Sequence, residues 1–178
     1  MPGHPLRGTT GCRWLQTWRA DPRAAALADR RHYSRKSPGT AQFSPPGRCF
    51  PLITTDGDAA WVTSWPLVEY TLHGLGDAWV CTLFRNEAPD RYRSSDLILE
   101  ALAATRAEWG DPPEGGTLTF VDAGKVRRKR DPGRCFLRAG FRRLPQLTKD
   151  RGLVILNLAV ADHPEPEHAG HAQLRLAA

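Results

Sequence analysis

Hydrophobic and polar residues alternate along short stretches of the chain, in the pattern of half-buried strands. Leu118 and Phe120 alternate with threonines within residues 117–122, and this spacing of two predicts a strand. Residues 78–84 and 153–158 are more continuously apolar and predict two buried strands. The first of these is the strongest candidate for the central strand of a sheet.

Two further strands are predicted as a hairpin. Residues 49–55 and 59–65 are rich in β-branched and aromatic side chains, and Asp56-Gly57 stands between them. Because Asp-Gly suits a tight turn, the two stretches predict an antiparallel pair.

Residues 94–109 predict an amphipathic helix with one apolar stripe. Ser94 or Ser95 can cap its start with a hydroxyl oxygen. The stripe consists of Leu97, Ile98, Ala101, Leu102, Thr105 and Trp109.

Asp-Pro pairs predict two more helices, over residues 21–31 and 131–140. The Asp is a good N-cap, and proline suits the first turn because its missing N–H would have no helical partner there. Gly140 supplies the positive φ that ends the second helix.

The element order predicts an α/β fold with a mixed, mostly antiparallel central sheet flanked by helices. Residues 1–19 are expected to be a partly loose segment, in which Trp14 and Trp18 are spaced as on one helical face. Residues 20–160 are expected to form a single catalytic domain. Residues 161–178 are rich in Pro, Glu, His and Ala and predict a disordered tail.

The chain is basic, with a formal net charge of +6 over 178 residues and a pI near 9.5. Arginine greatly outnumbers lysine, and the planar guanidinium group of arginine can bind a phosphate through two hydrogen bonds at once. An anionic partner is therefore favoured, either nucleic acid or a phosphorylated cofactor. A GC-rich genome would raise the arginine content without any function, and this alternative stays open.

The four cysteines are widely spaced and suggest neither a zinc ribbon nor a disulfide scaffold. No apolar stretch approaches the length of a membrane span, and the start of the chain lacks the apolar core of a signal peptide. A cytoplasmic location without a membrane partner is expected. The cysteines are Cys12, Cys49, Cys81 and Cys135.

The strongest electrostatic feature is a basic loop after the strand at 117–122. Its position beside a second basic stretch predicts binding to the backbone of double-stranded DNA, with marked salt sensitivity. A solvated surface is the alternative. The residues expected to contact nucleic acid are Arg35, Lys36, Lys125, Arg127, Arg128, Lys129 and Arg130.

The loop before the helix at 94–109 predicts an anion site. A helix N-terminus that follows a central strand presents free N–H groups and a favourable dipole to phosphate. The candidate cofactor-binding residues there are Arg91, Arg93, Ser94 and Ser95, although the two serines are also plain helix caps.

The element order and the motif Asp131…Cys135…Arg138-Ala-Gly-Phe141 resemble the GNAT acyltransferase superfamily. The resemblance implies that residues 80–109 form a pyrophosphate site for acetyl-CoA or a related acyl donor. One departure is evident: the usual glycine-rich loop is absent, and Asp90-Arg-Tyr-Arg-Ser-Ser95 stands in its place.

A narrower resemblance covers residues 30–158. The segments His32-Tyr33-Ser34, Arg85-Asn86-Glu87, Ser94-Ser95, Thr119-Phe-Val-Asp122 and 132–141 are similar to the Mom-type DNA-modification proteins of phages. That family is implicated in converting adenine in DNA to N6-carbamoylmethyladenine, which protects DNA from restriction. The resemblance implies a phage- or prophage-encoded enzyme, with His32, Tyr33, Arg85 and Asp122 near the reaction centre. It also implies iron as a candidate metal, with His32 and Tyr33 as its ligands.

The residues themselves allow simpler roles. Tyr33 can pack and His32 can act as a cation at a helix C-terminus, instead of carrying protons and stacking on a base. Asp122 can close the strand with an Asx turn, or accept a proton from an amine. Arg85 can pair with Glu87 or Asp122, or orient a carboxylate or phosphate.

Three functions stay open. The first is a DNA-modifying enzyme that places the N6 amine of a flipped adenine against an activated donor. The second is an acyl-CoA-dependent N-acetyltransferase acting on a small amine or a protein. The third is a non-catalytic DNA-binding module on a GNAT-like scaffold. A dimer is compatible with each of them.

Overall fold

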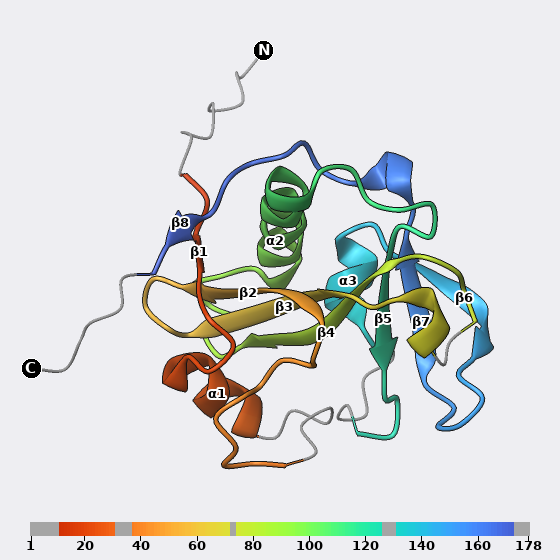
Figure 1. Cartoon of the computed structure of the whole chain (residues 1–178), viewed down its shortest axis with the longest axis horizontal. Coiled ribbons are helices and arrows are strands. Elements are labelled where there is room, and N and C mark those ends of the chain that lie inside the picture. The colour runs from red at the N-terminus through yellow and green to blue at the C-terminus, as the bar shows by residue number, and fades with distance from the viewer. Residues whose placement is uncertain (1–10, 31–36, 72–73, 126–130, 173–178) are drawn as a thin grey trace, which may run out of the picture.

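The computed structural model describes residues 11–30, 37–71, 74–125 and 131–172, and all structural statements below refer to these ranges. One mixed sheet of eight strands dominates the fold, and three α-helices pack on it (Figure 1). The strands are β1 (Trp14–Gln16), β2 (Arg48–Thr54), β3 (Ala59–Trp65), β4 (Trp79–Asn86), β5 (Thr117–Val121), β6 (Arg142–Leu147), β7 (Val154–Leu158) and β8 (Gly170–His171). The helices are α1 (Pro22–Asp29), α2 (Ser94–Trp109) and α3 (Arg134–Arg138), with short 3-10 turns at Val68–Tyr70 and Val160–Asp162.

The strands lie in the order β6-β7-β5-β4-β3-β2-β1-β8. β4 pairs with β5 in parallel, as β1 does with β8, and the other pairs are antiparallel. The expected α/β class with a mixed, mostly antiparallel sheet is therefore confirmed. Within the described ranges, no helix is long and apolar enough to cross a membrane.

The helices cover both faces of the sheet. Trp61 on β3 packs in a cluster with residues of α2 and α3, whereas its neighbours Ala60 and Val62 pack in a second cluster with Leu27 of α1. Successive strand residues point to opposite faces, so α1 lies across the sheet from α2 and α3. Figure 1 shows α1 and α2 on opposite sides of the sheet.

The predicted hairpin and the first two helices are confirmed. β2 and β3 flank the Asp56-Gly57 turn, where Gly57 has a φ of 78°. Asp21 caps α1, since its side chain accepts a hydrogen bond from the Arg23 amide at 2.9 Å. α2 spans the predicted residues, but its N-cap is Arg93, without a side-chain capping bond, and neither serine.

Other elements differ from the predictions. Trp14 lies in strand β1, opposite Thr54, and not on a helix; its Nε1 donates to the Leu97 carbonyl at 2.8 Å. β6 was not predicted, because five of its six residues are exposed and it has no apolar alternation. A three-residue strand and an exposed edge strand leave no periodic signal.

The third helix is shorter than predicted. α3 begins at Arg134, and its N-cap is Gly133 with a φ of 78°, so the Asp131-Pro132 pair precedes the helix. A Cβ on Gly133 would lie 2.6 Å from Cδ1 of Leu156, which explains why the chain has glycine where the loop crosses β7. The end at Gly140, with a φ of 97°, is as predicted.

Residues 161–172 pack on the domain, in contrast to the predicted disordered tail. His163 is buried, and its Nε2 lies 2.8 Å from the hydroxyl of Thr117. The Glu167 amide donates to the Ala103 carbonyl at 3.1 Å, and β8 then extends the sheet beside β1. Polar composition predicted disorder here, but a few anchoring contacts keep this segment in place.

The two parallel strands β4 and β5 stay together only briefly. Their ladder joins Trp79 to Thr117 at one end and Cys81 to Thr119 at the other, although β4 continues to Asn86. β4 also carries one residue more than β3 between Cys81 and Leu83, which is the signature of a β-bulge. We call the region beyond Cys81 and Thr119 the β4–β5 divergence.

Candidate functional site

The β4–β5 divergence brings together the ends of the two strands that carry predicted site residues. β4 ends with Arg85 and Asn86, and Asp122 directly follows β5. Ligands of open α/β sheets commonly bind beyond the carboxyl ends of parallel strands, because no ladder closes the sheet there. This edge is therefore the candidate site.

Aromatic side chains support the divergence on the face covered by α2 and α3. The ring of Phe84 lies 5.7 Å from that of Trp61 and 5.9 Å from that of Phe136, measured between centroids. Val121 at the end of β5 is buried in the same cluster. The strand ends are thus anchored on one face by packing, which fixes the residues that follow.

Arg85 lies on the opposite face, two positions after Leu83, which packs in the cluster with α1. Its Nε and Nη2 both lie 3.3 Å from Oε1 of Glu87. The other carboxylate oxygen of Glu87 lies 3.2 Å from Nη2 of Arg30, the residue after α1. Of the two partners expected for Arg85, the ion pair is with Glu87.

Asp122 closes the end of β5 with an Asx turn. Its Oδ1 accepts a hydrogen bond from the Gly124 amide at 3.1 Å, and its carbonyl accepts one from the Lys125 amide at 3.1 Å. Its Oδ2 lies 3.6 Å from Nη2 of Arg151, and 20% of the side chain is exposed. The turn role is confirmed, yet it uses only one carboxylate oxygen, so a proton-accepting role stays compatible with the geometry.

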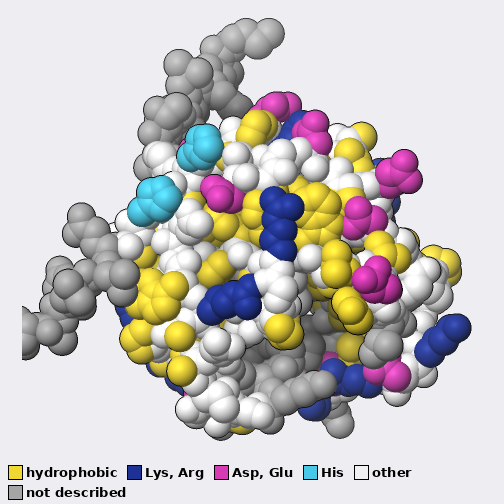
Figure 2. Space-filling view, viewed as in Figure 1, with side chains coloured by type: hydrophobic (Ala, Val, Ile, Leu, Met, Phe, Trp, Pro, Cys, Tyr) yellow, Lys and Arg dark blue, Asp and Glu magenta, His cyan; other side chains and the backbone are white. Residues whose placement is uncertain are grey.

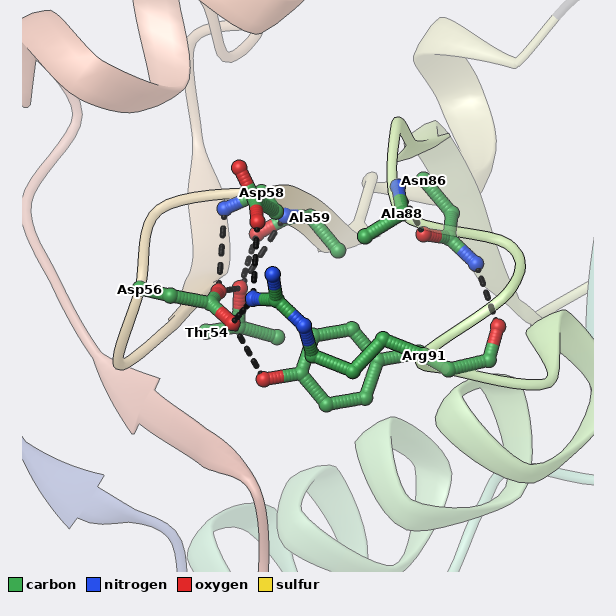
Figure 3. Close-up of polar contacts among 8 residues, drawn as sticks. Thr54, Asp56, Asp58, Ala59, Asn86, Ala88 and Arg91 are labelled. Atoms are coloured by element: carbon green, nitrogen blue, oxygen red, sulfur yellow. Dashed lines mark hydrogen bonds and ion pairs between the residues drawn. The ribbon is translucent and has the colours of Figure 1, made fainter.

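The predicted anion loop is held by contacts of its own. Nη1 of Arg91 lies 2.6 Å from Oδ2 of Asp56 and 3.0 Å from Oδ2 of Asp58 (Figure 3). The hydroxyl of Tyr92 donates to Asp56 as well, and Thr54 donates to it at 2.7 Å. We call Thr54, Asp56, Asp58, Arg91 and Tyr92 the Asp56 cluster.

The pKa of the Asp56 carboxyl reflects these contacts. Partial burial raises this pKa, but hydrogen bonds from Tyr92, Thr54, the Asp58 amide and Arg91 outweigh burial and hold the pKa well below its ordinary value of 3.8. Asp56 is therefore a charged anchor that ties the β2–β3 turn to the loop after β4. This cluster was missed from the sequence, where Asp56 indicated only a turn.

Of the other predicted cofactor-binding residues, the two serines have hydrogen-bond partners within the protein and Arg93 is exposed. Asn86 donates to the Tyr92 carbonyl at 2.8 Å and to the hydroxyl of Ser94 at 3.0 Å. Ser95 is buried, and its hydroxyl lies 3.4 Å from Oδ1 of Asp96. Arg93 is exposed at the N-cap. Because Asp96 already places a negative charge in the first turn of α2, a bound phosphate there would be repelled.

Several predicted site residues lie outside the described ranges. They are His32, Tyr33, Arg35, Lys36, Arg127, Arg128, Lys129 and Arg130. Lys125, the first residue of the basic loop, is exposed. Four more exposed arginines follow along the chain at Arg134, Arg138, Arg142 and Arg143.

The molecular face seen in Figure 2 has no continuous basic surface among its described side chains, because acidic, basic and hydrophobic side chains alternate there. A metal site is not evident either: within the described ranges, no three His, Cys, Asp or Glu side chains are grouped to hold an ion. The predicted iron ligands His32 and Tyr33 are not among these residues.

An aromatic cluster and a shallow hollow lie at the other ends of β4 and β5. The guanidinium carbon of Arg48 lies 4.6 Å from the ring centre of Trp65 and 4.7 Å from that of Trp109. The hollow, of about 590 Å³, is lined by Trp65, Leu75, Gly76, Asp77, Pro113, Glu114 and Gly115. It is separate from the candidate site, because Asp77 and Gly115 precede the strands that end at the divergence.

Comparisons of the chain with protein-family models, with curated proteins and with solved structures found no match.

Proposed function

We propose that this protein is a GNAT-like transferase that modifies the exocyclic N6 amine of adenine in DNA, with a carbamoylmethyl-type product as in the Mom-type proteins. The observation that carries the proposal is the β4–β5 divergence, with Arg85 at one rim and Asp122 at the other. The position of β4 beside β5 in the sheet and the bulge in β4 support a binding site at the divergence, since bulges are frequent beside active sites.

The divergence suits a donor with an extended chain. Where β4 and β5 no longer pair with one another, their facing backbone edges can bond to a ligand as an added strand would. A donor bound there would direct its reactive end towards the residues that follow the strands. Asp122 is the residue after β5, and Arg85 lies at the end of β4.

Asp122 has the chemistry that amine transfer requires. The amine nitrogen forms a bond to the donor carbon, the leaving group of the donor departs, and the nitrogen loses a proton. Oδ1 of Asp122 is fixed by the Gly124 amide, whereas Oδ2 has, among the described residues, only a long contact with Arg151. Oδ2 is therefore the atom that we assign to accept the amine proton.

DNA as the substrate is supported by charge and by position along the chain. The net charge is +6, and the basic segment 125–130 begins three residues after Asp122. Lysines and arginines at that spacing would contact the phosphates around a base presented to Asp122. A paired base would have to leave the duplex stack before its amine could reach the carboxylate.

An ordinary acyl-CoA-dependent acetyltransferase is supported less well. Arg91 is paired with Asp56 and Asp58, and Ser94 accepts a hydrogen bond from Asn86. Pyrophosphate binding at the start of α2 would have to break these contacts and overcome the charge of Asp96. A donor that does not rely on a pyrophosphate at this helix fits the site better.

The test is mass spectrometry of nucleosides in DNA from cells that express the protein. The wild type is expected to yield a heavier deoxyadenosine, whose added mass identifies the transferred group. Asp122→Asn should reduce this product at least about 100-fold, as expected for loss of a general base. Asp162→Asn, an exposed site in a 3-10 turn, is the matched control and should leave the product unchanged. Full modification by the Asp122→Asn variant would exclude the assigned role.

A further inference from the structure

We infer that Arg30 and Arg85 form a phosphate-binding clamp, and that Glu87 occupies this clamp in the free protein and is displaced by a phosphate group. The inference rests on the proposed function only in naming the DNA backbone as the main source of that phosphate. A phosphorylated donor is the other source with the same chemistry. The clamp joins the end of α1 to the end of β4.

The first observation is that two guanidinium groups converge on one carboxylate. Arg85 contacts Oε1 of Glu87 through both Nε and Nη2, and Arg30 contacts Oε2 through Nη2. The two arginines outnumber the single negative charge that they share. A phosphate has more acceptor oxygens than a carboxylate and can carry two charges, so it would satisfy both guanidinium groups better.

The second observation is that these contacts are long. The distances from Glu87 to its two arginines are 3.2 and 3.3 Å. Charge-assisted N–H···O bonds are normally about 2.7–2.9 Å. In the same molecule Arg91 lies 2.6 Å from Asp56, and Arg23 lies 2.8 Å from Asp21. Glu87 is thus held loosely compared with carboxylates that have a structural role.

The third observation is that the clamp is accessible. The side chains of Arg30 and Arg85 are 59% and 36% exposed, and that of Glu87 is 25% exposed. The residue opposite Arg85 on β3 is Ala60, which is too small to shield the guanidinium. Exposed ion pairs contribute little stability, so exchange of Glu87 for a phosphate costs little.

The experiment compares Glu87→Gln with Glu108→Gln. Each variant removes one negative charge, but Glu108 lies on the exposed side of α2, away from the clamp. Affinity for a fluorescent DNA duplex is measured at one fixed salt concentration, because DNA affinity varies steeply with salt. Glu87→Gln should bind about 3- to 10-fold more tightly than Glu108→Gln. Equal affinities of the two variants would overturn the inference.

A triple variant shows whether the gain comes from the two arginines. In Arg30→Gln/Arg85→Gln/Glu87→Gln, affinity should equal that of Arg30→Gln/Arg85→Gln, because no clamp is left for Glu87 to block. A remaining gain would show that Glu87 acts through general repulsion, and the clamp would be rejected. Thermal melting of each variant confirms that it is folded before binding is compared.

Inorganic pyrophosphate, used as a competitor, distinguishes the two sources of phosphate. If it displaces the duplex from Glu87→Gln and also binds without DNA, the clamp accepts free phosphates and a phosphorylated donor is favoured. If only DNA shows the gain, the backbone is the ligand. These outcomes do not depend on base modification, so the clamp can stand if no modified nucleoside is found, and it can fail if one is.

Discussion

Two groups of charged residues lie beside β4 and differ in how firmly they are held. In the Asp56 cluster, one carboxylate accepts hydrogen bonds from Tyr92, Thr54, Arg91 and the Asp58 amide. The bonds from Thr54, Arg91 and the Asp58 amide are 2.7, 2.6 and 3.1 Å long. At the divergence, Glu87 lies 3.3 Å from Arg85 and 3.2 Å from Arg30, and Asp122 lies 3.6 Å from Arg151. Both groups consist of carboxylates paired with arginines, but the ion pairs of the Asp56 cluster are shorter than those at the divergence.

This difference in bonding indicates which carboxylates have a structural role and which can bind a ligand. A carboxylate that is saturated with short hydrogen bonds fixes two loops and has no capacity left for a ligand. A carboxylate with a loosely held oxygen can exchange its partner with little loss of stability. The Asp56 cluster is therefore assigned to the fold, and the divergence to the proposed chemistry.

The largest effect on stability is expected for Asp56→Ala. This change removes the common acceptor of four hydrogen bonds, and we expect a loss of about 2 kcal/mol, reduced from the sum of the bonds because the site is partly exposed. The melting temperature should fall by about 4–8 °C. Asp90→Ala, at an exposed residue in the loop that carries Arg91, is the control and should change the temperature by less than about 1 °C. Equal melting of the two variants would contradict the structural role.

The same carboxylate should make stability sensitive to acid. The folded-state pKa of Asp56 lies below 3.8, so at acidic pH the unfolded chain takes up a proton before the folded one. The stabilisation is present above about pH 4 and is lost as pH falls further. Urea unfolding at pH 5 and pH 3 should show a smaller decline for Asp56→Asn than for the wild type. Identical declines would assign the acid sensitivity to other groups.

His163, which is buried and bonded to the hydroxyl of Thr117, is a polar group outside both of these groups. Its burial should also make stability depend on pH. Burial lowers the pKa of His163 below 6.5, although hydrogen bonds to backbone carbonyls partly oppose this. The unfolded chain therefore binds a proton first, and the free energy of unfolding should fall as pH decreases through 6.5. His163→Gln should be less stable at pH 8 but should show a weaker decline between pH 8 and pH 5. A decline as steep as in the wild type would refute this role.

The smallest effect is expected for Arg151→Gln. Its contact with Asp122 is 3.6 Å long and its side chain is 42% exposed, so stability should change by less than about 0.5 kcal/mol. Denaturant midpoints of this variant and of Lys149→Gln, an exposed neighbour, should agree. A loss as large as that of Asp56→Ala would erase the contrast between the two groups.

The sequence predicted the elements that have a local cause. The Asp-Gly turn, the Asp21-Pro22 cap and the apolar stripe of α2 each depend on a few neighbouring residues. β1 and β8 could not be predicted in this way, because they are short and their partner strands are distant in the chain. β6 pairs with the next strand, β7, but it is an exposed edge strand without apolar alternation. Glycine at position 133 could not be predicted either, because it is favoured by a φ of 78° and by the close approach of Leu156 on β7.

The candidate site was predicted in part. Arg85 lies at the end of β4 and Asp122 directly follows β5, and these strands are neighbours in the sheet. The resemblance implied that the two residues lie near one reaction centre, but the sequence did not predict that their strands are parallel. The pairing of Arg91 with Asp56 was not foreseen, because 35 residues separate them and both read as ordinary surface charges. Residues that share a hydrogen-bond network across such a distance leave no mark in periodicity or spacing.

The most direct test of the assigned site is a ¹⁵N–¹H NMR titration of the protein with a short DNA duplex. The amide signals of Arg85, Glu87 and Asp122 are predicted to shift as DNA is added, while those of Thr54, Asp56 and Tyr92 stay in place. Shifts concentrated in the Asp56 cluster, with none at the two strand ends, would contradict the assignment of the divergence as the functional site.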